Sequence, residues 1–485
     1  MNGPIRRLAI GLFLGLAVLV GTVSWIQAIA ADTYRSDPRN ARQAIAQAGK
    51  ERGLIVAADG TVLAESLPDE ADSRQFMRVY PEGPVFAHTV GYTSSLVGDG
   101  GLEAAYVDEL RSRRDLTFSD IVAAILGRDL RPRSIRLTLD ADLQRAAFEA
   151  LGDRSGAIVA LDPSTGAVLA MVSRPSFDPA SLEGAEAAEN WQALLDDPDR
   201  PLADRATREL YPPGSTFKTV VAAAAVDVGV ATSDTTFEDV RELPLPGSTA
   251  TISNYGGSLC GDGTEVTLMR GFIRSCNTVF ANLAMQVGAA DLGIMAEALG
   301  FNRELEFPWD VAESNFPAEE LEEDDAALAQ SGLGERDVRA TPLQMAMVAA
   351  AIANDGVVMQ PYLVDEMFDA DGDTVAETQP EELGRAMEPS TAETLEQMME
   401  RVVTEGTGTA ATVPGVRVAG KTGTAQAGEG ASYPWFVAYA PIESPAIALA
   451  VMFEPVPATG ESDTGGRVAA PVAGELIAGW LENRR

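Results

Sequence analysis

The sequence predicts an α+β protein in three parts: an N-terminal transmembrane helix, a small mixed domain, and a larger domain of antiparallel strands and helices. Three observations support this prediction. The chain has a long apolar run at its N-terminus, pairs of strand-like runs separated by turn residues, and apolar helix-forming runs between them. Its 485 residues are enough to bury a large core. We place the three parts at residues 1–31, 32–134 and 135–485.

The composition excludes several classes of function. A formal net charge of -36 argues against nucleic-acid binding, which needs a basic surface, and against membrane attachment through a polybasic patch. One histidine and two cysteines are too few for a Cys/His zinc site, so we expect no metal and no cofactor. A lone histidine is usually structural, and we interpret His88 in this way.

The first part is predicted to be a membrane anchor. Arg6 and Arg7 precede an apolar run over residues 8–29, which is long enough to cross a bilayer as a helix. Basic residues before the run place the N-terminus in the cytoplasm and the bulk of the chain outside, in an oxidising compartment. The alternative is a cleaved signal peptide, because residues 28–30 resemble a cleavage site. The length of the apolar run favours a retained anchor.

The second part begins with a polar segment, residues 32–50, which predicts a stalk leading away from the membrane. Asp59 and Gly60 then lie between two strand-like runs, a pattern typical of a β-hairpin. Residues 117–126 predict a short helix. These signals together indicate a small mixed domain.

The third part opens with a predicted amphipathic helix that has Leu143, Ala146, Ala147 and Leu151 on one face. Two apolar runs around a Pro-Ser-Thr-Gly turn predict a second hairpin. The acidic run Glu319–Asp325 predicts a solvated face without chemistry. Further elements are predicted at residues 341–354 (helix), 435–440 and 446–453 (strands), and 470–481 (helix).

The lysines point to a candidate site. Lys and Arg together number 36, of which three are lysines: Lys50, Lys218 and Lys421. The nucleotide composition of the gene is a sufficient cause for this bias, which then leaves lysine where arginine cannot replace it. Unlike arginine, lysine can lose its proton when it is desolvated. The surroundings of each lysine therefore decide whether it is a candidate functional residue.

Lys218 lies in the segment YPPGSTFKTVV, where two prolines and a glycine stop the preceding chain. Ser215 is then at a predicted helix N-terminus, and Lys218 follows three residues later on the same helix face. The helix dipole favours negative charge at Ser215, and a buried lysine has a lowered pKa and can accept a proton. Such a pair activates a serine without histidine, although the spacing alone is a weak motif.

Two further motifs accompany this pair. Lys421 opens the segment KTGT after a strand-like run, and Gly423 lets a ligand approach the backbone closely. Ser275, Cys276 and Asn277 form a polar triplet that opens another apolar helix. S-x-x-K, a serine–asparagine triplet and K-T-G occur together in penicillin-binding proteins and class A β-lactamases.

With these motifs the chain resembles the class B penicillin-binding proteins, membrane-anchored D,D-transpeptidases that cross-link peptidoglycan. Within them it is most similar to the short actinobacterial type, penicillin-binding protein A. The resemblance covers most of the chain, through the segments RGLIVAADGTVLAES, SRPSFDP, YPPGSTFK, SCN, SGLGERDVRATPLQMA and KTGTAQ. It implies a pedestal domain and a transpeptidase domain, the latter an antiparallel sheet flanked by helices plus an all-helical subdomain. Residues 32–134 are too few for a glycosyltransferase domain, which argues against the bifunctional class A.

The resemblance implies a role for each motif residue. Ser215 would be the acylated nucleophile, with Lys218 as its general base. Ser275 would relay a proton to the departing D-alanine, and Asn277 would bind the peptide amide and Lys218. Cys276 stands at the variable position of the middle motif, which the family tolerates.

The K-T-G segment would bind the substrate's carboxylate end. Lys421 would supply positive charge, and Thr422 and Thr424, on either side of Gly423, would hold the carboxylate. The backbone N–H groups of Ser215 and Thr424 would form the oxyanion hole. A cationic pocket is needed in so acidic a protein, because the stem peptide carries carboxylates.

Cys260 and Cys276 are predicted to form a disulfide, because both lie in the exported part and their number is even. The bridge would tether the Ser275–Asn277 turn beside the nucleophile. The alternative is two buried free thiols, since spacing alone cannot establish the distance between the two Cα atoms.

Other functions use related sequences. A D,D-carboxypeptidase has the same three motifs with water as acceptor, and a division scaffold would keep the site without using it. A serine β-lactamase lacks the long preceding domain and, in class A, uses an extra glutamate that the sequence does not locate; a sensor would need a signalling segment before the anchor. The resemblance implies as partners stem peptides ending in D-Ala-D-Ala, β-lactams, the membrane, a SEDS-type glycosyltransferase and division proteins.

Overall fold

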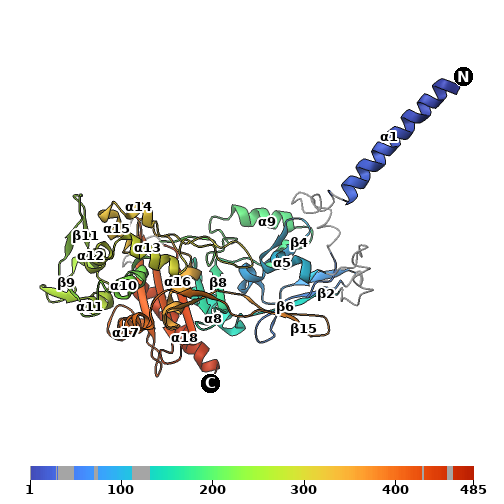
Figure 1. Cartoon of the computed structure of the whole chain (residues 1–485). Helices are drawn as coiled ribbons and strands as arrows, with labels where there is room; N and C mark the ends of the chain where they lie inside the picture. The colour runs from blue at the N-terminus through green and yellow to red at the C-terminus, as the bar shows by residue number, and fades with distance from the viewer. Residues whose placement is uncertain are drawn as a thin grey trace.

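The computed structural model describes residues 2–28, 30, 49–69, 75–111, 131–428, 431–455 and 463–484. Helix α1 (Asn2–Ala28), blue in Figure 1, contains an apolar span long enough to cross a membrane, and this span is not buried against other residues. Most of the predicted stalk and the helix predicted over residues 117–126 lie outside the described residues.

The small domain is built on a six-stranded sheet in the order β15-β14-β6-β1-β2-β3. The predicted hairpin around Asp59 and Gly60 is confirmed as the antiparallel pair β1–β2, while β1 and β6 are parallel. Two strands come from the third part of the chain, because β14 pairs with β6 and β15 with β14. The strands are β1 Ile55–Val56, β2 Val62–Pro68, β3 Phe76–Val79, β6 Ser134–Leu137, β14 Val364–Phe368 and β15 Thr374–Glu377.

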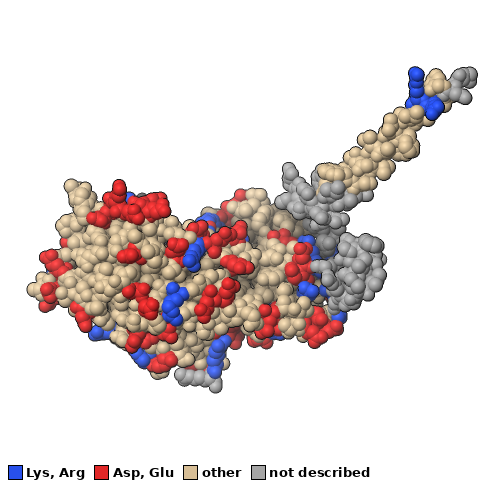
Figure 2. Space-filling view, in the orientation of Figure 1, with Lys and Arg blue, Asp and Glu red and all other residues tan. Residues whose placement is uncertain are grey.

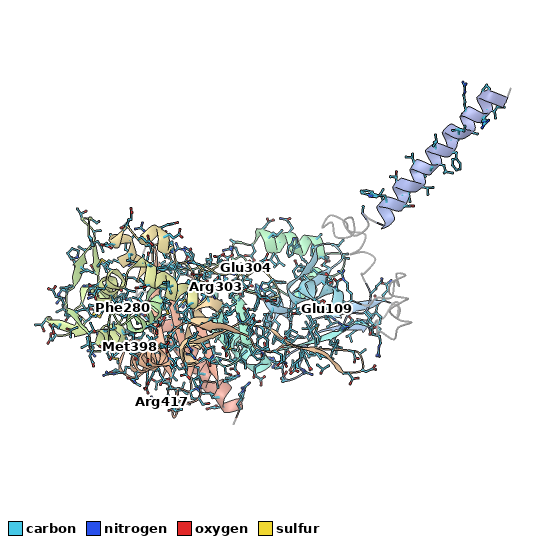
Figure 3. The ribbon with its side chains drawn as sticks, in the orientation of Figure 1. Glu109, Phe280, Arg303, Glu304, Met398 and Arg417 are labelled. Carbon is cyan, nitrogen blue, oxygen red and sulfur yellow. A yellow bond between two sulfur atoms is a disulfide. The ribbon has the colours of Figure 1, made fainter. Side chains whose placement is uncertain are left out.

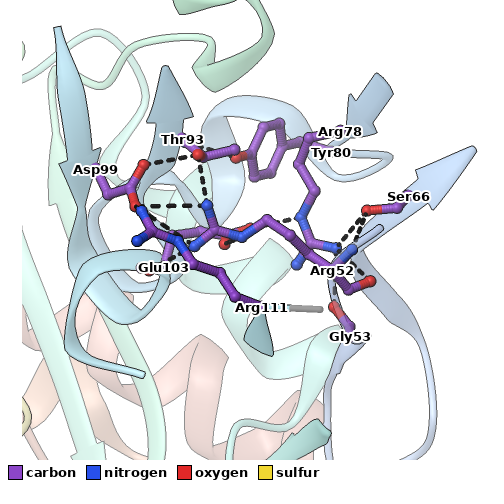
Figure 4. A network of polar contacts seen from close by, with 9 residues as sticks. All are labelled: Arg52, Gly53, Ser66, Arg78, Tyr80, Thr93, Asp99, Glu103 and Arg111. Carbon is purple, nitrogen blue, oxygen red and sulfur yellow. Dashed lines mark hydrogen bonds and ion pairs between the residues drawn. The ribbon is translucent and has the colours of Figure 1, made fainter. Parts of the chain in front are cut away.

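A cluster of buried charges, which we call the arginine cluster, lies beside this sheet (Figure 4). Both oxygens of the fully buried Glu103 carboxylate are paired, one with Arg78 Nε at 2.6 Å and the other with Arg52 Nε at 3.0 Å. Asp99 pairs with Arg111 at 2.9 Å and also contacts Arg52. The short elements around the cluster are α4 Ala87–Val90, β4 Tyr92–Ser94, β5 Gly98–Gly100, α5 Gly101–Ala105 and α6 Val107–Leu110.

The larger domain has a five-stranded antiparallel sheet in the order β17-β18-β19-β7-β8, with helices on both faces. Phe436 and Ala438 of β18 pack toward α8 and α18, while Val437 and Tyr439 face the core that contains α16. The second hairpin is confirmed as β7–β8. The elements are β7 Gly156–Leu161, β8 Val168–Arg174, β17 Ala419–Gly428, β18 Ala431–Ala440, β19 Ile447–Phe453, α8 Ala141–Leu151, α16 Pro342–Ala353 and α18 Ala470–Asn483.

The prediction for one residue on the buried face of α8 is wrong. Ala146 is exposed, whereas Leu143, Ala147 and Leu151 are buried as predicted. Gln144 is buried in its place, because its side-chain amide donates to the Val85 and Met171 carbonyls and accepts from Met171 N. A polar side chain is buried at low cost when its hydrogen bonds are satisfied in this way.

The remaining helices form a lobe at the end of the molecule opposite the small domain (Figure 1). Its helices are α10 Lys218–Asp227, α11 Leu268–Arg274, α12 Asn277–Val287, α13 Ala289–Ala298, α14 Ala318–Leu321 and α15 Asp325–Ser331, beside α17 Pro389–Glu405. Phe280 of α12 and Met398 of α17, labelled in Figure 3, belong to the core of this region. Smaller elements are α9 Ala187–Asp196 and the strand pairs β9 Thr236–Glu238 with β12 Glu265–Thr267, β10 Glu242–Pro244 with β11 Thr251–Ser253, and β13 Val357–Met359 with β16 Glu382–Arg385.

The surface is rich in carboxylates, and Asp and Glu are spread over the face drawn in Figure 2. Every carboxylate in the run Glu319–Asp325 is exposed, which confirms the predicted solvated face. His88 is half-buried, with Nε2 2.9 Å from the Pro201 carbonyl and its ring edge-on to Phe177. These contacts agree with a structural histidine.

Candidate active site

The turn that carries Ser215 lies against the edge strand β17. Ser215 belongs to a 3₁₀ turn, Gly214–Phe217, and α10 begins directly after it at Lys218. Gly214 has a φ of 54°, and its N–H donates to the Gly334 carbonyl at 2.9 Å. Ser215 is half-buried, and its hydroxyl makes no hydrogen bond with any described residue. The predicted helix start is confirmed, with one 3₁₀ turn added in front of it.

Lys218 is fully buried beside this serine. Its Nζ donates to the Ser275 carbonyl and to Asn277 Oδ1, each at 2.8 Å, and lies 5.5 Å from the centre of the Phe280 ring. Burial, and then the charge of Lys421, lower the pKa of Lys218 well below its ordinary value, which Glu335 partly opposes. A buried amine of lowered pKa can act as a base near neutral pH.

The turn between α11 and α12 holds the middle motif. Ser275 has a left-handed backbone with φ 58°, ending α11, and Cys276 N donates to the Gly271 carbonyl. A disulfide joins Cys260 to Cys276 with a Cα–Cα distance of 6.2 Å, which confirms that prediction. Asn277 Nδ2 donates to the Ser253 carbonyl, so its Oδ1 is directed to Lys218.

Lys421 approaches the same turn from β17. It is fully buried, and its Nζ donates to Ser275 Oγ at 2.8 Å and to the Thr422 carbonyl at 3.0 Å. The Phe272 ring centre lies 5.5 Å from Nζ. Burial lowers the pKa of Lys421 to about 7. The structure therefore brings both motif lysines into hydrogen-bond contact with the Ser275–Asn277 turn.

The other residues of the K-T-G segment have partners within the protein. Thr422 Oγ1 lies 2.6 Å from Thr407 Oγ1, and Thr424 Oγ1 accepts from Gly465 N at 3.1 Å, so the Thr424 hydroxyl can still donate. A Cβ at Gly423 would lie 2.8 Å from the Pro213 carbonyl. A glycine is thus needed at this position because the turn carrying Ser215 packs against it.

Sequence reasoning missed three residues of this site. Phe280 lies three residues after Asn277 in α12, on the same helix face, and Phe272 lies in the last turn of α11, three residues before Ser275. They supply the apolar surroundings of the two lysines. Glu335 follows Gly334 in a segment noted for its resemblance without any assigned role, and its charge acts on Lys218.

Electrostatically, the site is dominated by two buried amines. Neither Lys218 nor Lys421 forms an ion pair with any described carboxylate, and the described residues contain no group of acidic, Cys and His side chains suited to a metal ion. Such amines provide proton transfer and a local positive field. The arrangement fits acyl transfer through a serine, with negatively charged groups held near Lys421.

Comparison with known proteins agrees with this geometry. Residues 156–478 match the penicillin binding protein transpeptidase domain, and residues 52–135 match the penicillin binding protein A dimerisation domain. The chain belongs to the penicillin-binding protein family. Its curated relatives include peptidoglycan D,D-transpeptidase PbpA of Mycolicibacterium smegmatis, 40% identical over 499 residues, which covers 99% of each chain. The PbpA of Mycobacterium tuberculosis is 38% identical, with the same coverage.

Solved structures of penicillin-binding proteins have the same fold. The imipenem acyl-enzyme complex of penicillin-binding protein A from M. tuberculosis has a TM-score of 0.81 at 38% identity, covering 89% of this chain and 99% of that one. The D,D-transpeptidase domain from Eggerthella lenta has a TM-score of 0.79 at 38% identity, covering 90% of this chain and 99% of that one. The predicted resemblance to class B penicillin-binding proteins of the short actinobacterial type is therefore confirmed.

Proposed function

We propose that this penicillin-binding protein is a peptidoglycan D,D-transpeptidase that works through an acyl-enzyme on Ser215 and is inhibited by β-lactams. The observation that carries the proposal is the placement of Lys218. It is a fully buried amine three residues after Ser215, held by Asn277 and the Ser275 carbonyl, and it forms no ion pair with a described carboxylate. Relatives at 38–40% identity bear the same enzymatic name, and related structures are β-lactam acyl-enzymes.

In the acylation step, Ser215 Oγ attacks the carbonyl carbon of the penultimate D-alanine while Lys218 accepts its proton. Ser275, bonded to Lys421 Nζ, passes a proton to the departing D-alanine. Asn277 holds Lys218 and binds the peptide amide. The backbone N–H groups of Ser215 and Thr424 stabilise the oxyanion, and each such donor typically contributes about 10²–10³ in rate.

The donor's carboxylate end binds at the K-T-G segment. Lys421 supplies positive charge, and the hydroxyls of Thr422 and Thr424 hold the carboxylate beside Gly423. The half-buried Thr424 lies nearest to the exposed end of β17, where Gln426 faces solvent. Thr424 Oγ1 accepts a hydrogen bond from Gly465 N, which leaves the hydroxyl proton available for the carboxylate.

The location proposed for the enzyme is the cell membrane. Helix α1 anchors the chain, Arg6 and Arg7 hold its N-terminus in the cytoplasm, and the remaining parts lie outside. From the family resemblance we infer that a SEDS-type glycosyltransferase and division proteins are its partners.

Covalent labelling tests the proposal. The purified full-length protein is reacted with fluorescent penicillin, digested with trypsin and mapped by mass spectrometry. The adduct is expected on the peptide that contains Ser215 and is expected to disappear in Ser215→Ala, while Ser233→Ala, a serine outside the motifs, keeps it. An adduct at another residue, or none on folded protein, would contradict the proposed function.

A further inference from the structure

Glu335 lies at the active site although the mechanism above does not use it. The preceding residue, Gly334, is fixed against the nucleophile turn, because its carbonyl accepts from Gly214 N at 2.9 Å. A side chain at Gly334 would clash with the Gly214 carbonyl, 2.1 Å from an added Cβ. Glu335 is thus held one residue from a rigid contact with the turn that carries Ser215.

The carboxylate of Glu335 faces the catalytic groups. It interacts electrostatically with Lys218, and the backbone N–H of Gln426, two residues beyond Thr424 on β17, stabilises its charged form. Burial has the larger effect and raises the pKa of Glu335. The side chain is half-buried, so part of it remains open to a ligand.

Glu335 forms no ion pair with any described cation, although two arginines follow it closely in sequence. Arg336 pairs with Asp337 at 2.9 Å, and Arg339 Nη1 donates to the carbonyls of Arg336 and Val338. Both guanidinium groups are therefore engaged elsewhere. A half-buried carboxylate without a cation is costly unless a ligand supplies the positive charge.

The two halves of a transpeptidation differ in the charge of the molecule that must bind. The donor ends in a carboxylate, which Glu335 repels and Lys421 attracts. The acceptor brings an amine, which is an ammonium in water and which protonated Lys421 repels. A carboxylate close to the lysines offsets this repulsion for the acceptor alone.

We propose that Glu335 binds the ammonium group of the acceptor peptide and so favours transfer of the acyl group to an amine over hydrolysis. This inference rests on the proposed function, since it concerns the second half of the same reaction. Glu335 is a specificity-determining residue for the acceptor.

The acceptor ammonium gives one proton to the Glu335 carboxylate, and the neutral amine attacks the ester carbonyl carbon of the acyl-enzyme. A C–N bond forms and the bond from that carbon to Ser215 Oγ breaks. A second amine proton passes through Lys218 to Ser215 Oγ, which restores the hydroxyl, and Glu335 releases its proton to solvent.

The test measures how the acyl-enzyme divides between two products. Full-length protein receives an N-acyl-D-alanine thioester as donor and D-alaninamide, a cationic amine, as acceptor; chromatography separates the amide from the acid. Hydroxylamine, which is uncharged at neutral pH, serves as a second nucleophile. The variants are Glu335→Gln, Glu335→Asp, which keeps the charge, and Glu323→Gln, which removes an exposed carboxylate ahead of α15.

In Glu335→Gln, the D-alaninamide concentration that gives half-maximal amide formation is expected to rise about tenfold, the value of one lost charge-assisted hydrogen bond. Because the charge of Glu335 also acts on Lys218, the deciding measurement is the ratio of amide to hydroxamate formed from the same acyl-enzyme. This ratio is expected to fall in Glu335→Gln, to recover in part in Glu335→Asp and to stay unchanged in Glu323→Gln. An unchanged D-alaninamide dependence would overturn the inference while leaving the acylation mechanism intact. So would an equal loss of transfer to D-alaninamide and to hydroxylamine, which would mean that Glu335 acts only through Lys218. Failure of the wild-type protein to acylate would instead contradict the proposed function.

Discussion

Among the buried cations of the described residues, those of the arginine cluster and those of the active site are neutralised differently. In the arginine cluster, Arg52 and Arg78 each contact Glu103, a fully buried carboxylate (Figure 4). In the active site, Lys218 and Lys421 donate to neutral oxygens and contact aromatic rings. The first region therefore keeps its charges fixed, whereas the second makes charge on its amines unfavourable.

The use of arginine in the cluster and lysine in the active site follows from this difference. Arginine remains protonated in any protein environment and binds carboxylates through a planar set of donors, which suits the paired cluster. Lysine loses its proton when it is buried without a counter-ion, which suits a site that must move protons. In a chain with three lysines, two are fully buried in this site.

The largest effect is expected when the proposed base, Lys218, is replaced by an arginine that cannot lose its proton. Lys218→Arg keeps a cation where the reaction needs a neutral amine, so the second-order rate of acylation by a chromogenic β-lactam is expected to fall about 10²–10⁴-fold. Thermal melting verifies folding, and Lys50→Arg, the same exchange at the remaining lysine, is the matched control. Near-normal acylation by folded Lys218→Arg would exclude Lys218 as the base.

In the arginine cluster, a substitution is expected to lower stability and to leave the acylation rate unchanged. Glu103→Gln leaves Arg52 and Arg78 buried without their shared carboxylate, and the free energy of unfolding is expected to drop by about 3–5 kcal/mol. Denaturant unfolding measures the loss, with Asp108→Asn, an exposed neighbour, as control. The acylation rate per folded molecule should stay unchanged. A fall in that rate at full stability would mean that the cluster also acts on the active site.

The sequence revealed the site more completely than the fold around it. The three motifs are local, so Lys218, Asn277 and Lys421 could be assigned from short segments, and the hairpin at Asp59 and Gly60 from its turn residues. By contrast, β14 pairs with β6 across more than 200 residues of chain, and such pairing has no local pattern.

Contacts between distant segments also explain why Glu335 and Gln144 were missed. Glu335 is one of 72 acidic residues, and it differs from the others because Gly334 meets Gly214, a contact made by tertiary structure alone. Gln144 replaced Ala146 on the buried face of α8 because two carbonyls from other segments satisfy its amide. Periodicity records polarity, and it does not record where hydrogen-bond partners will lie.

A covalent bond holds the lysine site where ion pairs hold the arginine cluster. The Cys260–Cys276 disulfide closes a 16-residue separation next to Ser275. Removing both cysteines in Cys260→Ala/Cys276→Ala is expected to lower the free energy of unfolding by about 3 kcal/mol, with slower acylation because Ser275 and Asn277 are held less firmly. Thiol titration of the denatured, unreduced wild type should find no free thiol; two reactive thiols would contradict the bridge.

The smallest effect is expected at Lys421, where charge matters more than proton transfer. Its pKa of about 7 means that Lys421 is protonated below neutral pH and neutral above it. A donor carboxylate needs the protonated form, so the acylation rate of a carboxylate-bearing β-lactam should fall as pH rises above about 7. The acid limb, in contrast, belongs to Lys218, which must be neutral to act as a base.

Because arginine stays protonated, Lys421→Arg should lose the alkaline limb and keep the acid limb, while its bulk lowers the maximal rate about tenfold through imperfect positioning. A β-lactam whose carboxylate is esterified is the matched control, since it has no charge for Lys421 to bind and should show no alkaline limb with either protein. An alkaline limb that persists in Lys421→Arg would assign it to another group and would show that the second buried amine, like the arginines of the cluster, keeps its proton throughout.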